Sequence, residues 1–401
     1  MTAYACRRIF PLRMRVYCGL FRHKNENMIV FRVAKKRGVF ICVCCLLVLA
    51  VCAMLFAGDP DVIEALKTSD DTQWEATLQR FFDLRNDAVL RGDDEILQTI
   101  YLTGERNGRW AYENELVRSA YLKDWAAKQG VTILNIHSDI NLRSVKEVGR
   151  GYSFYLTAST LYEYAYDTSP DMVNGFRLGT YHSIDLIPGE EDDTWVISRE
   201  WYDDPLSGGF DADAVTDEMT QFISGHAGTD LSGLDERRVS AVAYADMYCG
   251  AASDGSNEYR YNSNYTNFND LGGDCANFAS QVLFEGGGFK KTATWNYRGG
   301  KGSRAWVNAQ AFRTFLSYSG RGSQIAKGKY KDVYQSAYGL LPGDIVAYVK
   351  KGKVTHIAVV TGLDSNGYPL VSCHNADRNR VPWDIGWHYG ATTFILIHVN
   401  Y

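Results

Sequence analysis

The chain has 401 residues, of which 46% are hydrophobic and 13% aromatic. That length and composition provide enough apolar material for two or three folded domains and exclude a largely disordered protein. The formal net charge is -5 and no long run of residues carries one sign. The sequence therefore gives little electrostatic basis for binding nucleic acid, and we expect no such partner.

An apolar run over residues 39–57 contains no charged side chain and follows four Lys and Arg residues within 32–37. Its length approaches the ~20 residues that cross a bilayer. Basic residues before such a run predict that the following chain is exported. We therefore expect residues 1–58 to be a basic leader with a signal peptide or a membrane anchor, a buried core helix being the alternative. The rest of the chain is expected to be extracytoplasmic, either secreted or attached to the membrane through this segment.

The cysteines are distributed unevenly along the chain. Six of the nine lie at or before Cys52, which leaves Cys249, Cys275 and Cys373 in the part expected to be exported. Three cysteines cannot form a complete disulfide framework, so at least one is a thiol or pairs with another molecule. This part contains no CxxC or HxxH spacing, and we predict neither a metal ion nor another cofactor.

The first folded region combines helices with strands. Apolar residues recur at helical spacing in residues 72–92 and 112–130, and each segment ends at a glycine. Four segments rich in Ile, Val, Tyr, Thr and Phe follow, at 131–145, 151–166, 174–188 and 193–202. We predict an α+β accessory domain over residues 59–202, with the layout of a cystatin-like or nuclear-transport-factor-like (NTF2-like) domain.

A change in composition marks a second region. Residues 203–234 are rich in Gly, Ser and Asp, which is typical of a linker. A helical pattern follows over residues 235–249, and alternating strand patterns come late in the chain. We predict a second α+β domain over residues 235–401.

The segment GGDCANFASQVLFEGG places Cys275 at the start of a predicted helix. Unpaired N–H groups at a helix start lower the pKa of a thiol and can hold a carbonyl oxygen on which negative charge develops. Asp274 is expected to cap this helix. A cysteine in such a place is more often a packing residue, so a catalytic role also requires an imidazole nearby.

Two histidines can supply the imidazole and its neighbour. His356 lies near the start of the strand-like segment THIAVVTG, and His374 lies in YPLVSCHNADRN. Adjacent antiparallel strands can place a polar side chain beside an imidazole, as an orienting residue requires, although either histidine can also be a core residue. Strand alternation puts His374 and Cys373 on opposite faces, so a site that contains His374 is expected to exclude Cys373 and Asn375. Asn375 and Asp377 remain alternatives for the third position.

A cysteine at a helix start, followed by a histidine and a polar residue on successive strands, resembles the papain-like cysteine hydrolases, including the CHAP and NlpC types. More specifically, RRVSAVAYADMYC, GGDCANFASQVLFEGGG, PGDIVAY and THIAVVTG resemble the putative amidase domain family of bacterial surface proteins. The core motif of that family reads roughly Asp-Cys-Thr-Asn-Phe-x-Ser-Gln, and Ala276 stands where Thr is usual. The resemblance covers about residues 235–401.

The resemblance implies a papain-like α+β domain at residues 235–401. It implies Cys275 as the nucleophile, His356 as general base and acid, and His374 as the third catalytic residue. Candidate residues for substrate contact are Asn277, Gln281 and Trp295.

The implied function is an extracytoplasmic cysteine amidohydrolase that cleaves amide or peptide bonds of cell-wall peptidoglycan. The alternative is a catalytically silent binding or scaffold protein of the cell envelope.

Overall fold

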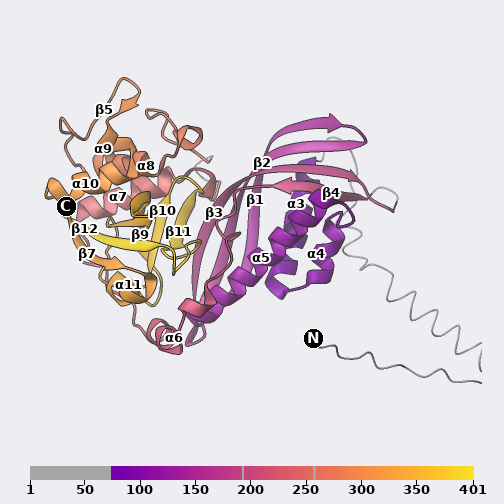
Figure 1. Cartoon of the computed structure of the whole chain (residues 1–401), viewed down its shortest axis with the longest axis horizontal. Helices are drawn as coiled ribbons and strands as arrows, with labels where there is room; N and C mark the ends of the chain where they lie inside the picture. Colours follow the sequence, from indigo (N-terminus) through magenta and orange to yellow (C-terminus); the bar gives the residue numbers. More distant parts are fainter. Residues whose placement is uncertain (1–73, 192–193, 256–258) are drawn as a thin grey trace, which may run out of the picture. The chain divides into compact units, whose positions relative to one another are not determined.

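The computed structural model describes residues 74–191, 194–255 and 259–401, which belong to one compact unit, Asp61–Tyr401. Three helices open the described chain (Figure 1), namely α3 (Trp74–Arg91), α4 (Asp94–Ile100) and α5 (Arg106–Gln129). The buried side chains of α3 recur every three to four residues, so one stripe of the helix faces the core. Gly130 adopts the left-handed conformation that ends α5 and donates its N–H to Ala126 O and Ala127 O. The two predicted helical segments are confirmed.

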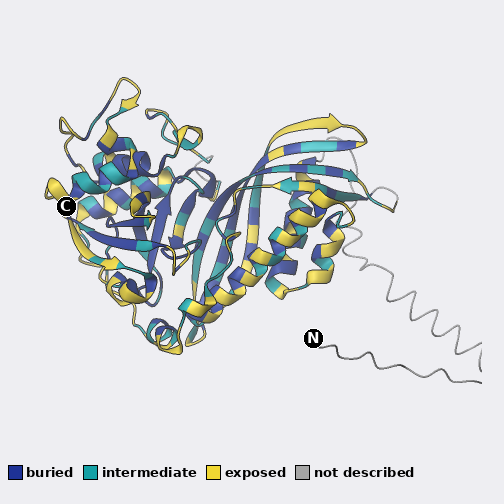
Figure 2. Ribbon diagram, viewed as in Figure 1, coloured by how far each residue is buried: buried dark blue, intermediate teal, exposed yellow. Residues whose placement is uncertain are grey.

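Four long antiparallel strands follow these helices. They are β1 (Val131–Val148), β2 (Gly151–Tyr166), β3 (Ser169–Pro188) and β4 (Trp195–Trp201). Each overlaps one of the predicted strand segments. Their inner faces are buried under the helices, whereas the far end of β1 is exposed (Figure 2).

The C-terminal half, residues 235–401, adds helices and six more strands of the same sheet. The helices are α7 (Glu236–Met247), α8 (Cys275–Gln281), α9 (Arg304–Val307), α10 (Ala309–Tyr318) and α11 (Tyr330–Ala337). The strands are β7 (Gly322–Gly328), β8 (Ile345–Lys350), β9 (Lys353–Leu363), β10 (Pro369–Cys373), β11 (Arg378–Pro382) and β12 (Thr393–Val399). A short separate hairpin consists of β5 (Tyr297–Arg298) and β6 (Lys301–Gly302). The predicted linker also contains a helix, α6 (Asp217–Ser224), which buries Met219 and Ile223.

Strands from both halves form one sheet. Within the described residues, ten antiparallel strands run in the order β1-β2-β3-β11-β10-β9-β8-β12-β7, with β4 beside β3. The halves join where β3 pairs with β11, at Leu178 with Arg378 and Arg177 with Asn379. The N–H of Gly179 also donates to Asp377 O at 2.8 Å.

The predicted fold class is therefore wrong as stated. The chain is α+β, but the strands expected to form two domains share one large antiparallel sheet. Among the described residues, no helix combines the length and the apolar character that crossing a bilayer requires. The apolar run at 39–57, on which the predicted membrane segment depended, lies outside the described residues. The predicted domain limits at residues 202 and 235 stay a prediction.

A buried ion pair fastens the two halves to each other. Lys128 Nζ, at the end of α5, lies 2.5 Å from Asp384 Oδ2 in the C-terminal half. Lys128 also donates to the hydroxyls of Tyr330 and Tyr368, and Tyr389 donates to the same carboxylate at 2.5 Å. Burial lowers the pKa of Lys128, and the charge of Asp384 opposes that effect. Removing one partner of such a buried pair costs about 3–5 kcal/mol, so this contact strongly favours one arrangement of the halves.

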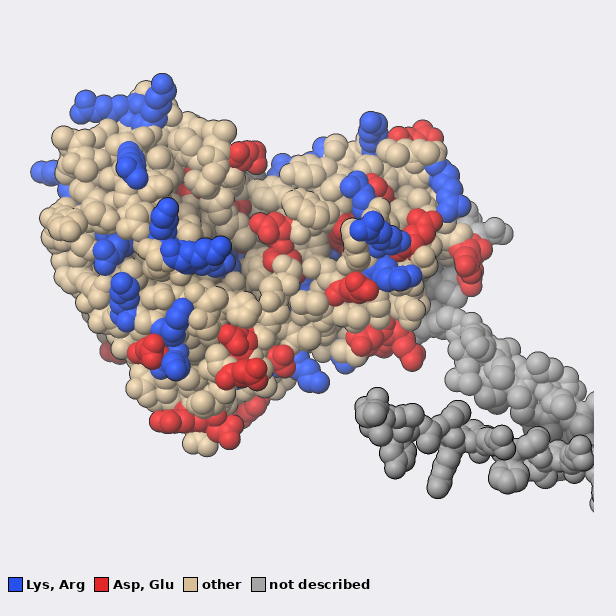
Figure 3. All heavy atoms as spheres, in the orientation of Figure 1, with Lys and Arg blue, Asp and Glu red and all other residues tan. Residues whose placement is uncertain are grey.

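The two faces of the C-terminal strands have different coverings. Helices α7, α8 and α10 lie on one face, and α11 on the other (Figure 1). Along β9, Ile357 and Val359 belong to the core under α8, whereas Ala358 and Val360 belong to the core that continues into the N-terminal half. On the face drawn in Figure 3, basic side chains are spread among uncharged ones rather than gathered in one large patch.

Candidate active site

Helix α8 begins at Cys275 after a sharp turn through two glycines. Gly272 and Gly273 have φ values of 106° and 122°, a region that side chains other than glycine rarely adopt. A Cβ atom at Gly273 would also lie 3.1 Å from Asn375 Oδ1. All seven residues of α8 are buried, and a π-helical turn (Val282–Gly286) continues the helix. The predicted helix start is confirmed.

Asp274 does not cap this helix. Its Oδ1 accepts hydrogen bonds from Phe268 N at 2.9 Å and from Asn277 Nδ2 at 2.8 Å, and its Oδ2 lies 2.5 Å from His374 Nδ1. No side-chain cap bond joins Asp274 to the helix. The expected capping role is therefore wrong, because tertiary partners occupy the carboxylate.

Asn375 takes the capping position instead. Its Oδ1 accepts the N–H groups of Asp274 and Cys275, the latter at 3.1 Å. Strand β10 ends at Cys373, and Asn375 and Ala376 have φ values of 67° and 57°. Side-chain alternation therefore does not continue past the strand, and His374 and Asn375 both face α8. The expectation that a site containing His374 excludes Asn375 is wrong.

His374 is held at both ring nitrogens. Nδ1 faces the carboxylate of Asp274, and Nε2 lies 2.8 Å from the carbonyl oxygen of Tyr248. Both partners are acceptors, so the ring is satisfied only when both nitrogens carry protons. Burial by itself favours the neutral ring, but the hydrogen bond to Asp274 and the negative charge of Asp377 raise the pKa of His374. The imidazolium is thus a fixed cation beside the start of α8, and it has no lone pair with which to accept a proton.

Asp377 lies two residues after Asn375, in the loop that follows β10. Its Oδ2 accepts the N–H of Ala251 at 2.8 Å and the hydroxyl of Tyr261. Burial raises its pKa, and the charge of His374 opposes that effect. These contacts make Asp377 a support of the loop after β10.

The Cys275 thiol lies among backbone N–H groups. The nearby backbone N–H groups of Ile357 and Ala276 favour a thiolate. Burial outweighs them and raises the pKa of Cys275 to about 11. The side chain retains a 7% exposed fraction, whereas Cys373 and Cys249 have none. Cys275 is therefore a protonated thiol at neutral pH, and it is the least deeply buried of these three cysteines.

His356 is turned toward a different thiol. Its Nε2 lies 3.2 Å from Cys373 Sγ, and its ring packs against Tyr348 and Trp387. Burial and the positive charge of Arg378 lower its pKa to about 3. The described contacts thus join His356 to Cys373 and not to Cys275, because alternation along β9 directs His356 and Ile357 to opposite faces.

The two predicted catalytic residues, Cys275 and His356, nevertheless lie near the same part of β9. The Cys275 sulfur lies near the backbone N–H of Ile357, the residue that follows His356 on β9. The sulfur is therefore within one side-chain length of His356. Proton transfer between them requires the imidazole to leave Cys373 and the face of β9 on which it lies, and the catalytic pair stays a prediction.

The candidate residues for substrate contact are buried. Asn277, Gln281 and Trp295 have exposed fractions of 0%, 2% and 0%. Asn277 accepts from Trp306 Nε1 at 2.9 Å, Gln281 accepts from Tyr244 OH at 2.9 Å, and Trp295 Nε1 donates to Ser280 Oγ at 2.9 Å. These side chains hold α8 against its neighbours and do not line an opening in this conformation.

Apart from Asn375 and Asp377, the opening beside the site is lined by residues that the sequence did not single out. A cavity of about 360 Å³ lies between the loop at 375–377, the loop at 267–270 and the strands β2, β3 and β4. Its walls include Asn375 from the candidate site and Trp201 from the N-terminal half. Only the pairing of β3 with β11 brings these residues together, so no local sequence signal indicated it. In the described part of the chain, no cluster of His, Cys, Asp and Glu is arranged to hold a metal ion.

Comparison with known proteins adds one finding. Residues 235–397 match the model of a family described as a putative amidase domain. No curated protein and no solved structure matches the chain. The match covers the part that contains Cys275, His356 and His374, and it supports a hydrolase of the amidase type.

Proposed function

We propose that the protein is a cysteine amidohydrolase of papain-like type, related to the CHAP and NlpC hydrolases. The observation that carries this proposal is the position of the Cys275 sulfur, which lies at the start of α8 against the backbone that follows His356. The amidase match over residues 235–397 supports the reaction class. Cys275 is the least deeply buried of the three cysteines, which supports its choice as nucleophile.

In the proposed reaction, Cys275 attacks the amide carbon of the substrate. The N–H groups of Ile357 and Ala276 lie near the sulfur and are suited to stabilise negative charge at this point. His356 takes the thiol proton and donates it to the leaving amine, and the thioester is then hydrolysed by water that His356 activates. Because the pKa of Cys275 is raised and that of His356 is lowered, proton transfer accompanies attack and does not precede it.

His374 and Asn375 act as positioning residues in this proposal. Asn375 holds the N–H groups at the start of α8, and His374 holds Asp274 beside them. Their contacts fix the backbone that carries the nucleophile. Their role is thus to keep the sulfur against β9, beside the backbone of His356.

The proposed substrate is an amide or peptide bond of cell-wall peptidoglycan, and the proposed location is extracytoplasmic. The location depends on the apolar run at residues 39–57 and its preceding basic residues. The substrate depends on that location and on the family resemblance.

The test uses the full chain with purified peptidoglycan, and released amines are identified by mass spectrometry. We expect new amino termini with the wild type and none with C275A. Equal release by C275A would remove Cys275 from the chemistry. No release by either protein would contradict the proposed substrate.

One observation favours a second function, that of an envelope binding protein without catalysis. The raised pKa of Cys275 and the contact between His356 and Cys373 describe an inactive arrangement. Iodoacetamide labelling near neutral pH separates the two functions. Faster labelling of Cys275 than of Cys249 and Cys373 supports the hydrolase, whereas equally slow labelling of all three supports the binding protein.

A further inference from the structure

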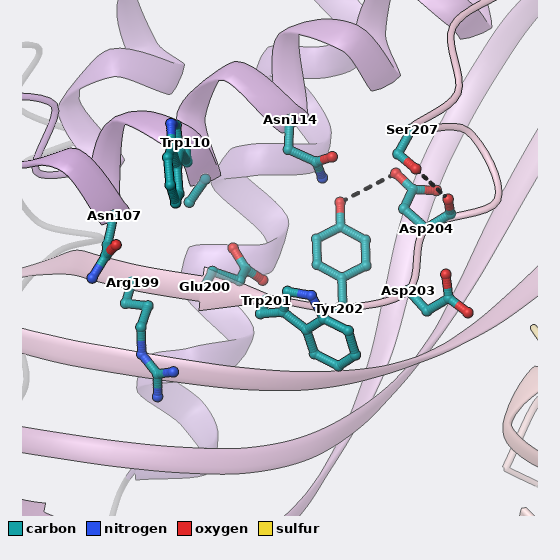
Figure 4. Close-up of a pocket in the computed structure, with 11 residues that line it drawn as sticks. Asn107, Trp110, Asn114, Arg199, Glu200, Trp201, Tyr202, Asp203, Asp204 and Ser207 are labelled. Carbon is teal, nitrogen blue, oxygen red and sulfur yellow. Dashed lines mark hydrogen bonds between the residues drawn. The ribbon is translucent and has the colours of Figure 1, made fainter. Parts of the chain in front are cut away.

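A second cavity lies in the N-terminal half, between α5, β4 and the chain that follows β4 (Figure 4). Its volume is about 510 Å³. Two tryptophans line it, Trp110 from α5 and Trp201 from the end of β4, with exposed fractions of 54% and 66%. The guanidinium of Arg106 lies over the ring of Trp110, 4.1 Å from its centroid, and the remaining exposed surface of the two tryptophans is available to a ligand.

Polar side chains without partners line the same cavity. Asn107 and Asn114 project from α5 toward it, and Asp203 lies on its other side (Figure 4). Within the described residues, none of the three side chains forms a hydrogen bond or an ion pair with the protein. The nearby guanidinium of Arg199 is already held by Asp185 at 2.6 Å. The cavity thus presents amide groups and carboxylates, which disfavours an anionic ligand.

The floor of the cavity is held in place by a buried network. Glu200 accepts from Arg85 Nη1 and from Tyr101 OH, both at 2.9 Å, and Tyr202 OH donates to Glu115 Oε1 at 2.5 Å. These bonds fix β4 and the residue after it before any ligand binds. A preformed wall loses little conformational entropy on binding, which favours affinity.

This cavity shares two lining residues with the one beside the candidate active site. Trp201 and Asp203 line both of them. The cavity beside the candidate active site is lined by Asn375, whose side chain accepts the N–H of Cys275. We call these two neighbouring cavities together the groove, one of them lined by α5 and the other by Asn375 beside the start of α8.

We propose that this groove binds a neutral oligosaccharide that carries amide groups, such as a chain of N-acetylated amino sugars. The C–H faces of pyranose rings stack on Trp110 and Trp201, and the acetamido and hydroxyl groups pair with Asn107, Asn114 and Asp203. The groove then places an amide attached to the sugar chain next to Cys275. This last step depends on the proposed hydrolase function, whereas binding of the sugar does not.

The test titrates the β-1,4-linked tetramer of N-acetylglucosamine into the full-length C275A protein by calorimetry. We expect binding, and affinity that falls about tenfold in C275A/W110A and in C275A/W201A, since one lost stacking contact is worth about 1.4 kcal/mol. The control is C275A/Y318A, because Tyr318 is an exposed aromatic residue, at 89%, that lines neither cavity. Both tryptophans are exposed, so these variants are expected to fold, which unchanged circular dichroism confirms.

Two further probes define the ligand class. The glucose tetramer, which lacks acetamido groups, is expected to bind more weakly than the N-acetylglucosamine tetramer. A neutral tetrapeptide is expected not to compete. Stronger binding of the tetrapeptide, or affinity that is unchanged in both tryptophan variants, would overturn the proposal.

The binding result and the cleavage result are independent. Sugar binding by a protein that cleaves no amide leaves the groove proposal standing and contradicts the hydrolase. Amide cleavage by a protein that does not bind the tetramer contradicts the groove proposal alone. With an active enzyme, W201A is expected to raise KM about tenfold and leave kcat unchanged.

Discussion

Each half of the molecule buries one histidine against a carboxylate, and the two pairs differ in charge. In the N-terminal half, His182 Nδ1 lies 2.7 Å from Glu200 Oε1, and its Nε2 lies 2.7 Å from Thr180 Oγ1. In the C-terminal half, His374 binds Asp274 and the carbonyl of Tyr248. The pKa of His182 is lowered, mainly by burial, whereas the pKa of His374 is raised.

The difference follows from the neighbours of each ring. The Thr180 hydroxyl can donate to Nε2 of His182, so a neutral ring is fully bonded there. Arg85 lies 2.9 Å from the same carboxylate and supplies the positive charge that balances Glu200. His374 has only acceptors at its nitrogens, so it must itself be the cation. The comparison assigns a structural role to the first pair and a role in positioning Cys275 to the second.

The first prediction has the largest expected effect: amide cleavage depends on Cys275 and His356 of the C-terminal half and not on His182 of the N-terminal half. C275A is expected to abolish amide cleavage, and H356A to reduce kcat/KM by about 10²–10⁴-fold through loss of the general acid and base. H182Q is expected to keep the wild-type kcat, because His182 contacts no part of the candidate site. Steady-state cleavage rates per folded molecule provide the measurement. A loss of kcat in H182Q as large as that in H356A would contradict the assignment.

The second prediction concerns the charge balance in the N-terminal half. E200Q is expected to lower the free energy of unfolding by about 3–5 kcal/mol, because it removes the charge that Arg85 and Tyr101 face. The matched control is D185N, which breaks a partly exposed pair with Arg199 and is expected to cost less than about 1 kcal/mol. Urea unfolding measures both variants. Equal losses in the two would show that burial does not strengthen the Glu200 network.

Local patterns in the sequence predicted the parts of the fold that depend on near neighbours. The helix before Gly130 follows from apolar spacing and a terminal glycine, and the helix at Cys275 follows from two glycines and a run of small and apolar residues. The predicted capping role of Asp274 is wrong. The local sequence favours a cap, but in the folded chain the carboxylate of Asp274 binds His374, which is far away in the sequence.

The joint sheet, the direction of His356 and the position of Asn375 depend on pairing between distant segments, which local sequence patterns do not indicate. The pairing of Leu178 with Arg378 joins the halves into one sheet and creates the groove. The direction of His356 depends on the register of β9 against its neighbours, which includes a shift between Tyr348 and Val349. Asn375 reaches the helix start because the backbone after β10 has a positive φ value. None of these features has a periodicity that a single chain segment reveals.

The third prediction tests the pair beside Cys275. D274N is expected to destabilise the fold by about 1.5–3 kcal/mol, the range for a hydrogen bond to a charged group. It also removes the support of the α8 start, so kcat is expected to fall while the affinity of the groove for the sugar tetramer stays unchanged. Thermal unfolding, cleavage rates and calorimetry give the three readouts. Unchanged kcat in D274N would leave the pair with a purely structural role.

The smallest expected effect is a difference in how the two pairs respond to pH. The raised pKa of His374 means that its contribution to stability is fully present below its unfolded pKa of about 6.5 and is lost as pH rises through the folded value. Burial by itself raises the pKa of Glu200, but the charge of Arg85 and the hydrogen bond from His182 lower it to about 2. The contribution of Glu200 is therefore present above about pH 4.5 and is lost as pH falls toward 2.

Unfolding free energies of the wild type, H374Q and E200Q across pH test this contrast. The stability gap between wild type and H374Q is expected to shrink as pH rises above 6.5, by about 1.4 kcal/mol for each unit by which folding shifts the pKa. The gap between wild type and E200Q is expected to shrink in the opposite direction, as pH falls below 4.5. A gap for H374Q that does not shrink as pH rises would contradict the raised pKa of His374, and a gap for E200Q that does not shrink as pH falls would contradict the lowered pKa of Glu200.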